Sequence, residues 1–136
     1  MLLILSVIIS VSLGVNYYHQ STPKGRFYTY FHMNPLPSVQ NLRVTGVVYV
    51  TGGHLDITFD VSPSDCDKLI AGIGFANVTE DDLENKAKFR AIQKDVYENI
   101  FPEQLIYIDS EYEGMSYRML IVNEEKTKAC FKRYRM

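Results

Sequence analysis

The stretch that decides the fold is HLDITFDVSPSD, residues 54–65. Its first eight residues alternate between apolar and polar side chains, which is the period of a half-buried antiparallel strand. Ser62 and Pro63 then supply a helix cap and a first helical residue, and Asp65 favours the positive end of the helix dipole. This stretch therefore predicts a strand that leads directly into a helix. The apolar positions are Leu55, Ile57, Phe59 and Val61, and the polar positions are His54, Asp56, Thr58 and Asp60.

The residues before this stretch predict a second strand and a hairpin. Residues 42–50 are rich in β-branched side chains, and Thr51-Gly52-Gly53 is a hairpin turn signal. Residues 27–33 are dense in aromatic side chains and are a candidate edge strand. Pro35 and Pro37 follow this segment and break any ladder, because proline cannot donate a backbone hydrogen bond.

The residues after the stretch complete the fold class. The first helix stops at Gly72 and Gly74, and a second helix begins at Thr79. Three strand patterns follow, at residues 105–108, 115–122 and 127–134. This order predicts an α+β protein, with an antiparallel β-sheet and two helices packed on one face.

An N-terminal hydrophobic segment precedes this domain. Residues 1–15 carry no charge, and a helix over residues 2–15 would be about 21 Å long. That is short of a hydrocarbon core of about 30 Å but typical of a signal peptide. Small residues in Ser12-Leu13-Gly14 predict cleavage between Gly14 and Val15. The alternatives are an uncleaved anchor, with Tyr17 and Tyr18 at the membrane interface, and a buried core element.

The domain organisation follows from these patterns. We expect a signal peptide or N-terminal membrane anchor at 1–14, a linker at 15–26 and a single α+β domain at 27–136. The formal net charge is −2 at pH 7, so no general affinity for nucleic acid is implied. Residues 126–136 hold five basic side chains and no acidic one. They are either a solvated tail that complements the acidic segment 80–113 or a contact for anionic lipid or an acidic partner.

Two cysteines, Cys66 and Cys130, are a disulfide candidate. In an exported protein such a pair is often bonded, and closing a loop of about 65 residues would stabilise the fold by roughly 4 kcal/mol. The helix of Cys66 would then lie across the strand of Cys130. The alternative is two buried free thiols.

The sequence contains no motif for a reaction, a cofactor or a structural zinc site. His54, Asp56 and Asp60 share one strand face, where a metal could bridge two of them, but a solvated polar face also explains them. The ten tyrosines suit either strand packing or a binding surface. We therefore expect no catalytic, cofactor-binding or metal-binding residues, no nucleic acid partner and no small-molecule cofactor.

Two segments carry a resemblance to a class of known proteins. Residues 36–42, LPSVQNL, and residues 55–65, LDITFDVSPSD, resemble small exported bacterial envelope proteins, often lipoproteins, of uncharacterised function. Some of these are immunity proteins encoded beside interbacterial toxins. The chain departs from the lipoprotein form, because Val15 stands where a lipidated cysteine is expected.

The sequence and the resemblance together lead to one functional expectation. It is a non-catalytic, extracytoplasmic protein of the periplasm or cell envelope that binds a protein partner, with an immunity-type role as its most concrete form. Membrane association through residues 1–18 belongs to the same expectation. The alternatives are a single-pass inner-membrane protein of structural or regulatory role and a small metal-binding protein or enzyme.

Overall fold

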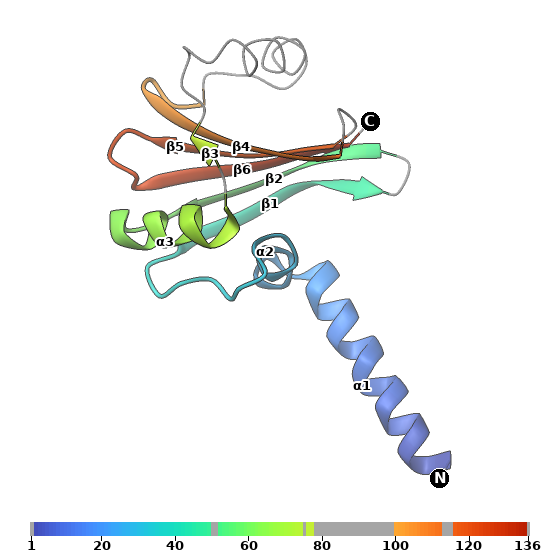
Figure 1. Cartoon of the computed structure of the whole chain (residues 1–136). Coiled ribbons are helices and arrows are strands. Elements are labelled where there is room, and N and C mark those ends of the chain that lie inside the picture. The colour runs from blue at the N-terminus through green and yellow to red at the C-terminus, as the bar shows by residue number, and fades with distance from the viewer. Residues whose placement is uncertain (1, 50–51, 75, 78–99, 113–115, 136) are drawn as a thin grey trace. The chain divides into compact units, whose positions relative to one another are not determined.

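The structure, a computed structural model, describes residues 2–49, 52–74, 76–77, 100–112 and 116–135 (Figure 1). The chain divides into two compact units, residues 1–37 and residues 38–136. The second unit combines a helix with an antiparallel sheet, so the predicted α+β class is confirmed. The expected second helix, from Thr79, lies outside the described residues.

The first unit consists of two helices, α1 (Leu2–Ser21) and α2 (Pro23–Phe31). Thr22 joins them: its side chain caps α2 by accepting a hydrogen bond from the Gly25 N–H at 3.0 Å. The prediction of an edge strand at residues 27–33 is therefore wrong. A threonine cap followed by proline at the first helical position starts a helix here, and this local signal overrides the strand preference of the aromatic residues.

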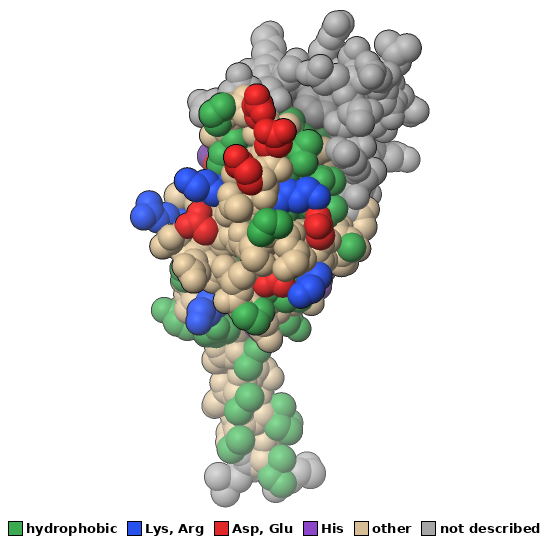
Figure 2. Space-filling model, turned by 90° about the vertical axis from the view of Figure 1, so that its left-hand side faces the viewer, with side chains coloured by type: hydrophobic (Ala, Val, Ile, Leu, Met, Phe, Trp, Pro, Cys, Tyr) green, Lys and Arg blue, Asp and Glu red, His purple; other side chains and the backbone are tan. Residues whose placement is uncertain are grey.

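Helix α1 exposes apolar side chains along its length (Figure 2). Gly14 and Val15, the expected cleavage residues, lie inside this helix, which continues to Ser21. Within the described part of the chain, no helix has the length and apolarity needed to cross a membrane.

The second unit is built on a sheet in which every neighbouring pair of strands is antiparallel. The order across the sheet is β1-β2-β6-β5-β4-β3. The strands are β1 (Gln40–Tyr49), β2 (Gly52–Asp60), β3 (Ala76–Asn77), β4 (Gln104–Tyr112), β5 (Ser116–Asn123) and β6 (Lys128–Arg135). The five strands predicted within this unit are confirmed, and the two-residue β3 is an addition that the sequence did not predict.

One face of the sheet, the helix face, carries α3 (Pro63–Ile73) (Figure 1). Its buried side chains come from alternate positions of four strands, as the pleat requires. They are Leu55, Ile57, Phe59, Tyr107, Arg118, Leu120, Val122, Ala129 and Phe131. Helix α3 contributes Cys66 and Leu69, both buried, and Lys126 in the β5–β6 turn forms an ion pair with Asp67 of α3 at 2.6 Å. The prediction that Leu55, Ile57, Phe59 and Val61 are the core positions is confirmed.

The opposite face is divided into an apolar and a polar part. On β4 and β5, Ile106, Met119 and Ile121 form a buried cluster against which Ile100 and Phe101 pack. On β1, β2 and β6 the same face is polar and largely exposed. We call this part the polar face; its polar side chains are Arg43, Thr45, His54, Asp56, Thr58, Asp60, Lys128 and Lys132, and the buried Cys130 lies between the two lysines on β6.

The structure corrects the disulfide prediction: Cys66 and Cys130 are free and buried. Cys130 pairs in register with Thr58 and Ile121, so its side chain belongs to the face opposite α3. Its neighbours Ala129 and Phe131 point to the helix face instead. The sheet therefore separates the two sulfur atoms. Successive side chains of a strand point to opposite faces, so a shift of one residue along β6 is enough to move a side chain from the helix face to the opposite face.

Candidate binding surface

The polar face is assembled by the registers of three strands. Thr58 of β2 lies opposite Arg43 of β1, and Asp60 of β2 lies opposite Lys128 of β6. The sequence placed the β2 residues on one face but did not pair them with partners from other strands. The alternation of residues 42–45 indicated the face of Arg43, but the predicted turn at Thr51-Gly52-Gly53 could not give its partner, because Gly52 and Gly53 belong to β2 and pair with Tyr49 and Val48.

Each carboxylate on this face is held by a neighbouring strand. Lys132 Nζ lies 3.0 Å from Asp56 Oδ2, in a pair that is largely shielded from solvent. Asn41 Nδ2 donates to Asp60 Oδ2 at 2.6 Å. Asn41 can reach Asp60 because β1 is irregular between Gln40 and Arg43, where Asn41 adopts φ 52°. Asparagine tolerates this left-handed conformation better than most residues.

These contacts bear on the hypothesis of a metal site at His54, Asp56 and Asp60. The two carboxylates are directed to separate partners, and His54 is exposed. Among the described residues, no three histidine, cysteine, aspartate or glutamate side chains are grouped so that they could hold a metal ion. The arrangement is that of a solvated polar face whose charges are paired across strands.

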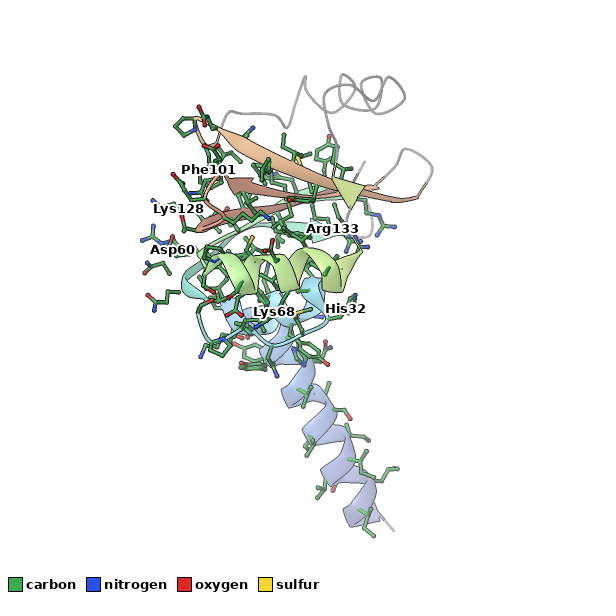
Figure 3. The ribbon with its side chains drawn as sticks, turned by 60° about the vertical axis from the view of Figure 1, so that its left-hand side comes forward. His32, Asp60, Lys68, Phe101, Lys128 and Arg133 are labelled. Carbon is green, nitrogen blue, oxygen red and sulfur yellow. The ribbon has the colours of Figure 1, made fainter. Side chains whose placement is uncertain are left out.

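A hollow of about 220 Å³ opens beside this face. It is lined by Asn41, Arg43, Thr58, Phe59, Asp60, Phe101, Lys128 and Ala129. Figure 3 shows Phe101, Lys128 and Asp60 along this side of the molecule. The Phe101 N–H donates to Gln104 Oε1 at 3.2 Å, and Phe101 packs against the Ile106 cluster. These two contacts fix the position of Phe101 at the wall of the hollow. The hollow thus combines two cations, a carboxylate and an aromatic ring.

A second hollow, of about 520 Å³, adjoins the first and shares Phe101 and Lys128 with it. Its lining is Phe101, Pro102, Glu103, Asn123, Glu124, Glu125, Thr127 and Lys128. A hydrogen bond with Glu103 and the negative charge of Glu103 raise the pKa of the Glu124 carboxyl. The second hollow therefore carries three carboxylates together with the shared Lys128, whereas the first carries Arg43, Lys128 and Asp60. Figure 2 views this end of the sheet and shows acidic and basic side chains interspersed on it.

The β5–β6 turn that carries two of these glutamates has a fixed shape. Asn123 Oδ1 accepts hydrogen bonds from the backbone N–H groups of Thr127 and Lys128, each at 2.8 Å. Lys126 adopts φ 56° within the turn. We refer to the two hollows and their lining residues together as the binding surface. Sequence reasoning missed Phe101 and Glu103, because their neighbours in space come from β1, β6 and the β5–β6 turn, far away along the chain.

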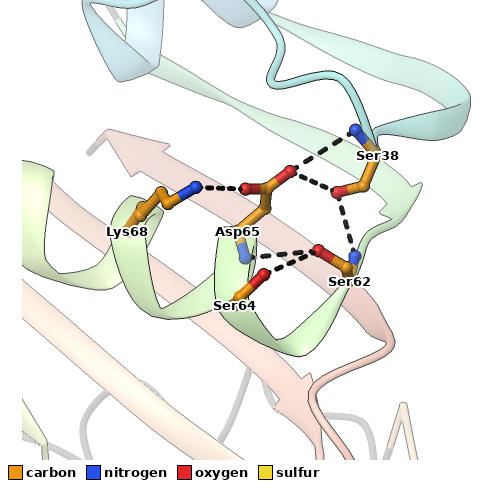
Figure 4. A network of polar contacts seen from close by, with 5 residues as sticks. All are labelled: Ser38, Ser62, Ser64, Asp65 and Lys68. Atoms are coloured by element: carbon orange, nitrogen blue, oxygen red, sulfur yellow. Dashed lines mark hydrogen bonds and ion pairs between the residues drawn. The ribbon is translucent and has the colours of Figure 1, made fainter.

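A separate polar network fixes the start of the sheet to the start of α3 (Figure 4). Ser38 Oγ donates to Asp65 Oδ2 at 2.6 Å, and Lys68 Nζ lies 2.8 Å from Asp65 Oδ1. Ser38 Oγ also accepts a hydrogen bond from the Ser62 N–H at 3.0 Å. The hydrogen bonds from Lys68 and Ser38 hold the pKa of the Asp65 carboxyl below its usual value. Every member has a structural partner, so this network organises the fold.

The two thiols are poor candidates for chemistry. Burial raises the pKa of both Cys66 and Cys130 to about 11. A thiol is nucleophilic as its thiolate, and near neutral pH almost none would be present at either residue.

Comparison with protein-family models, with curated proteins and with solved structures returns no match.

Proposed function

We propose that this chain is a small, non-catalytic protein that acts outside the cytoplasm by binding another protein through the binding surface. One observation carries the proposal: two adjoining hollows meet at Phe101 and Lys128, and their rims carry charges of both signs, with Arg43 and Asp60 at the first hollow and three glutamates at the second. An aromatic side chain with a charged rim is the usual anatomy of a protein interface. Aromatic residues and arginine also provide a large share of binding energy at such sites.

The charge pattern favours a partner that is itself mixed in charge. A partner with acidic groups near Arg43 and Lys128 and basic groups near Glu103 and Glu124 would satisfy both sides at once. Such complementarity sets the orientation of a complex and excludes partners of the wrong pattern. The carboxyl of Glu124, whose pKa is raised by Glu103, would gain from a basic partner group.

The location outside the cytoplasm rests on α1 and on the resemblance to small exported envelope proteins. Within that class, neutralisation of a toxin is the most concrete role for a non-catalytic binding protein, and the product of a neighbouring gene is the first partner to test. A metal-binding or enzymatic role through His54, Asp56 and Asp60 has no observation in its favour, since the two carboxylates are directed to Lys132 and Asn41.

Site-specific photo-cross-linking in the producing cells tests the binding surface. A photoreactive residue at Thr58 or at Thr45, both exposed on the polar face, should capture one and the same protein. Ala71, exposed on α3, is the matched control position and should not capture it. Charge reversal of Arg43 and Lys128 to glutamate should lower the cross-linked yield from Thr58 at least about tenfold.

Two results would contradict the proposal. One is equal capture of a protein from Thr58 and from Ala71, which would show that the contact is unspecific. The other concerns location: alkaline phosphatase joined to the end of the full chain is active only after export. An inactive fusion that accumulates at a normal level would place the protein in the cytoplasm.

A further inference from the structure

The first unit presents an apolar surface that is not confined to one side of a helix. The large apolar side chains of α1 between Ile4 and Val15 are each 51–67% exposed. They include the consecutive residues Val7, Ile8 and Ile9, which point about 100° apart around a helix axis. A helix that docks on a protein or pairs with a second copy is apolar on one stripe, whereas a helix that is apolar on all sides is typical of a lipid environment.

The end of this apolar run has the composition of a membrane interface. Tyr17 and Tyr18 follow Val15, and Tyr17 is 75% exposed. Tyr28 of α2 is also exposed and stacks on the ring of His19, with 4.7 Å between centroids. Tyrosine is enriched where hydrocarbon gives way to headgroups, because its ring is apolar and its hydroxyl is polar.

The charge of the first unit points to an anionic surface. Residues 1–37 contain Lys24 and Arg26 and no aspartate or glutamate; the first acidic residue of the chain is Asp56. Both cations belong to the first turn of α2, directly beyond the tyrosines. Basic residues next to an inserted segment are attracted to anionic headgroups.

The structure also ties the end of α1 to α2. Thr22 Oγ1 donates to the Tyr18 carbonyl at 2.8 Å, and Arg26 Nε donates to the Gln20 carbonyl at 2.8 Å. The backbones approach so closely that a Cβ atom on Gly25 would lie only 2.1 Å from the Tyr18 oxygen. The residues that follow the candidate cleavage site at Gly14 are thus part of a folded helical corner, and the site itself is helical. Proteases bind their substrates in an extended conformation, so this site is a poor substrate once α1 has formed.

We propose that α1 is retained on the mature protein as a lipid anchor, with the turns from Ile4 to Val15 in the hydrocarbon of an anionic bilayer and the α1–α2 corner at its headgroups. This surface and its partner are independent of the binding surface on the sheet. The protein would thus have two interactions, one with a protein through the binding surface and one with a lipid bilayer through α1.

Vesicle flotation of the full chain tests the lipid interaction. The protein should float with phosphatidylcholine vesicles and more completely with vesicles that also contain phosphatidylglycerol, and Lys24→Ala should remove only this increment. Ile8→Glu should lower the vesicle-bound fraction at least about tenfold, because a charge in hydrocarbon is costly. Gln20→Glu adds the same charge beyond the apolar run and should float with the uncharged phosphatidylcholine vesicles as the parent protein does. Unchanged flotation of Ile8→Glu, or no flotation of the parent, would overturn the proposal.

The depth of α1 in the bilayer and the retention of residues 1–14 are measured by separate experiments. The chain contains no tryptophan, so a single introduced tryptophan is a unique fluorescent probe. Ile9→Trp should be quenched mainly by lipids brominated deep in the acyl chain, and Tyr17→Trp mainly by lipids brominated near the headgroup. Absence of quenching at Ile9→Trp, with self-association in its place, would identify a second copy as the occupant and reject lipid.

Intact mass of the protein isolated from cell membranes should include residues 1–14, and a mature chain that starts at Val15 would overturn retention. A negative result for lipid binding or for retention of residues 1–14 would not change the photo-cross-linking from Thr58. The two proposals are therefore tested independently.

Discussion

Ser38 and Asp65 are joined by a hydrogen bond of 2.6 Å from the Ser38 hydroxyl to Asp65 Oδ2, across 27 residues of sequence. The Ser38 backbone N–H points to the same oxygen at 3.4 Å. This contact fastens the segment that enters β1 to the first turn of α3. Because Lys68 holds the other carboxylate oxygen, the network depends on an ionised Asp65.

Asp65→Asn should lower the melting temperature at neutral pH, and the difference from the parent protein should shrink in acid. The pKa of Asp65 is lowered in the folded protein, so its contribution is complete above the pKa of an unfolded aspartate, about 3.9. It is lost as the pH falls below that value through the lower pKa of the folded state. Thermal unfolding followed by circular dichroism between neutral pH and pH of about 2 measures this. Asp67→Asn, which removes only an ion pair at the surface, is the control and should have a smaller effect at neutral pH. A difference between Asp65→Asn and the parent that stays constant down to the lowest pH would contradict the assignment.

Ser62→Ala should destabilise the second unit by about 1 kcal/mol, the usual cost of losing a helix N-cap. The Ser62 hydroxyl accepts a hydrogen bond from the Asp65 N–H at 3.3 Å at the start of α3. Ser64→Ala is a matched control, because Ser64 is exposed and its hydroxyl contacts the Ser62 hydroxyl without capping a backbone N–H of α3. Urea unfolding gives both free energies, and equal losses for the two variants would argue against the cap.

The thiols should resist alkylation in the native protein and react only after unfolding. Burial raises the pKa of Cys66 and Cys130 to about 11, so at pH 8 only about one thiol in a thousand is ionised even where reagent has access. Alkylation followed by mass spectrometry should find two reactive thiols per unfolded chain, and reducing agent should leave the melting temperature unchanged. A chain that takes up no reagent when unfolded without reductant would show that the two sulfurs are bonded after all.

Gly46→Ala should destabilise the β1–β2 hairpin by about 1–3 kcal/mol. Gly46 has φ +80°, and a Cβ atom there would lie 2.4 Å from the His54 carbonyl oxygen. Gly14→Ala makes the same chemical change in open space on α1 and is expected to leave the unfolding of the sheet unaltered. Denaturant titration of both variants separates the backbone clash from a general effect of the added methyl group; a Gly46→Ala variant as stable as the parent would mean that β1 relaxes at little cost.

Local patterns predicted the second unit well, because its elements are set by nearby residues. The alternation in residues 54–61 predicted the three buried positions of β2 and the buried Val61 that follows it, and Ser62-Pro63 predicted the start of α3. The same kind of reasoning misplaced Cys130, since the face of a strand residue depends on register with strands elsewhere in the chain. Aromatic content misled the prediction for residues 27–33, where Thr22 and Pro23 held the decisive signal.

The candidate binding surface could be predicted only in part. The sequence placed Thr58 and Asp60 on one polar face, because both belong to one strand. Arg43, Phe101 and Glu124 reach this surface from three other segments. Bringing such segments together requires the strand order, in which β6 lies between β2 and β5, and no local pattern contains that order.

The position of β6 between β2 and β5 has a consequence for how the sheet forms during synthesis. β6 is synthesised after β1 to β5, yet it is the strand that connects the β1–β2 hairpin to β4 and β5. Until β6 leaves the ribosome, the nascent chain holds two separate pieces of sheet, each with an unsatisfied edge. Completion of the sheet therefore waits until β6 has been synthesised and can pair with both β2 and β5.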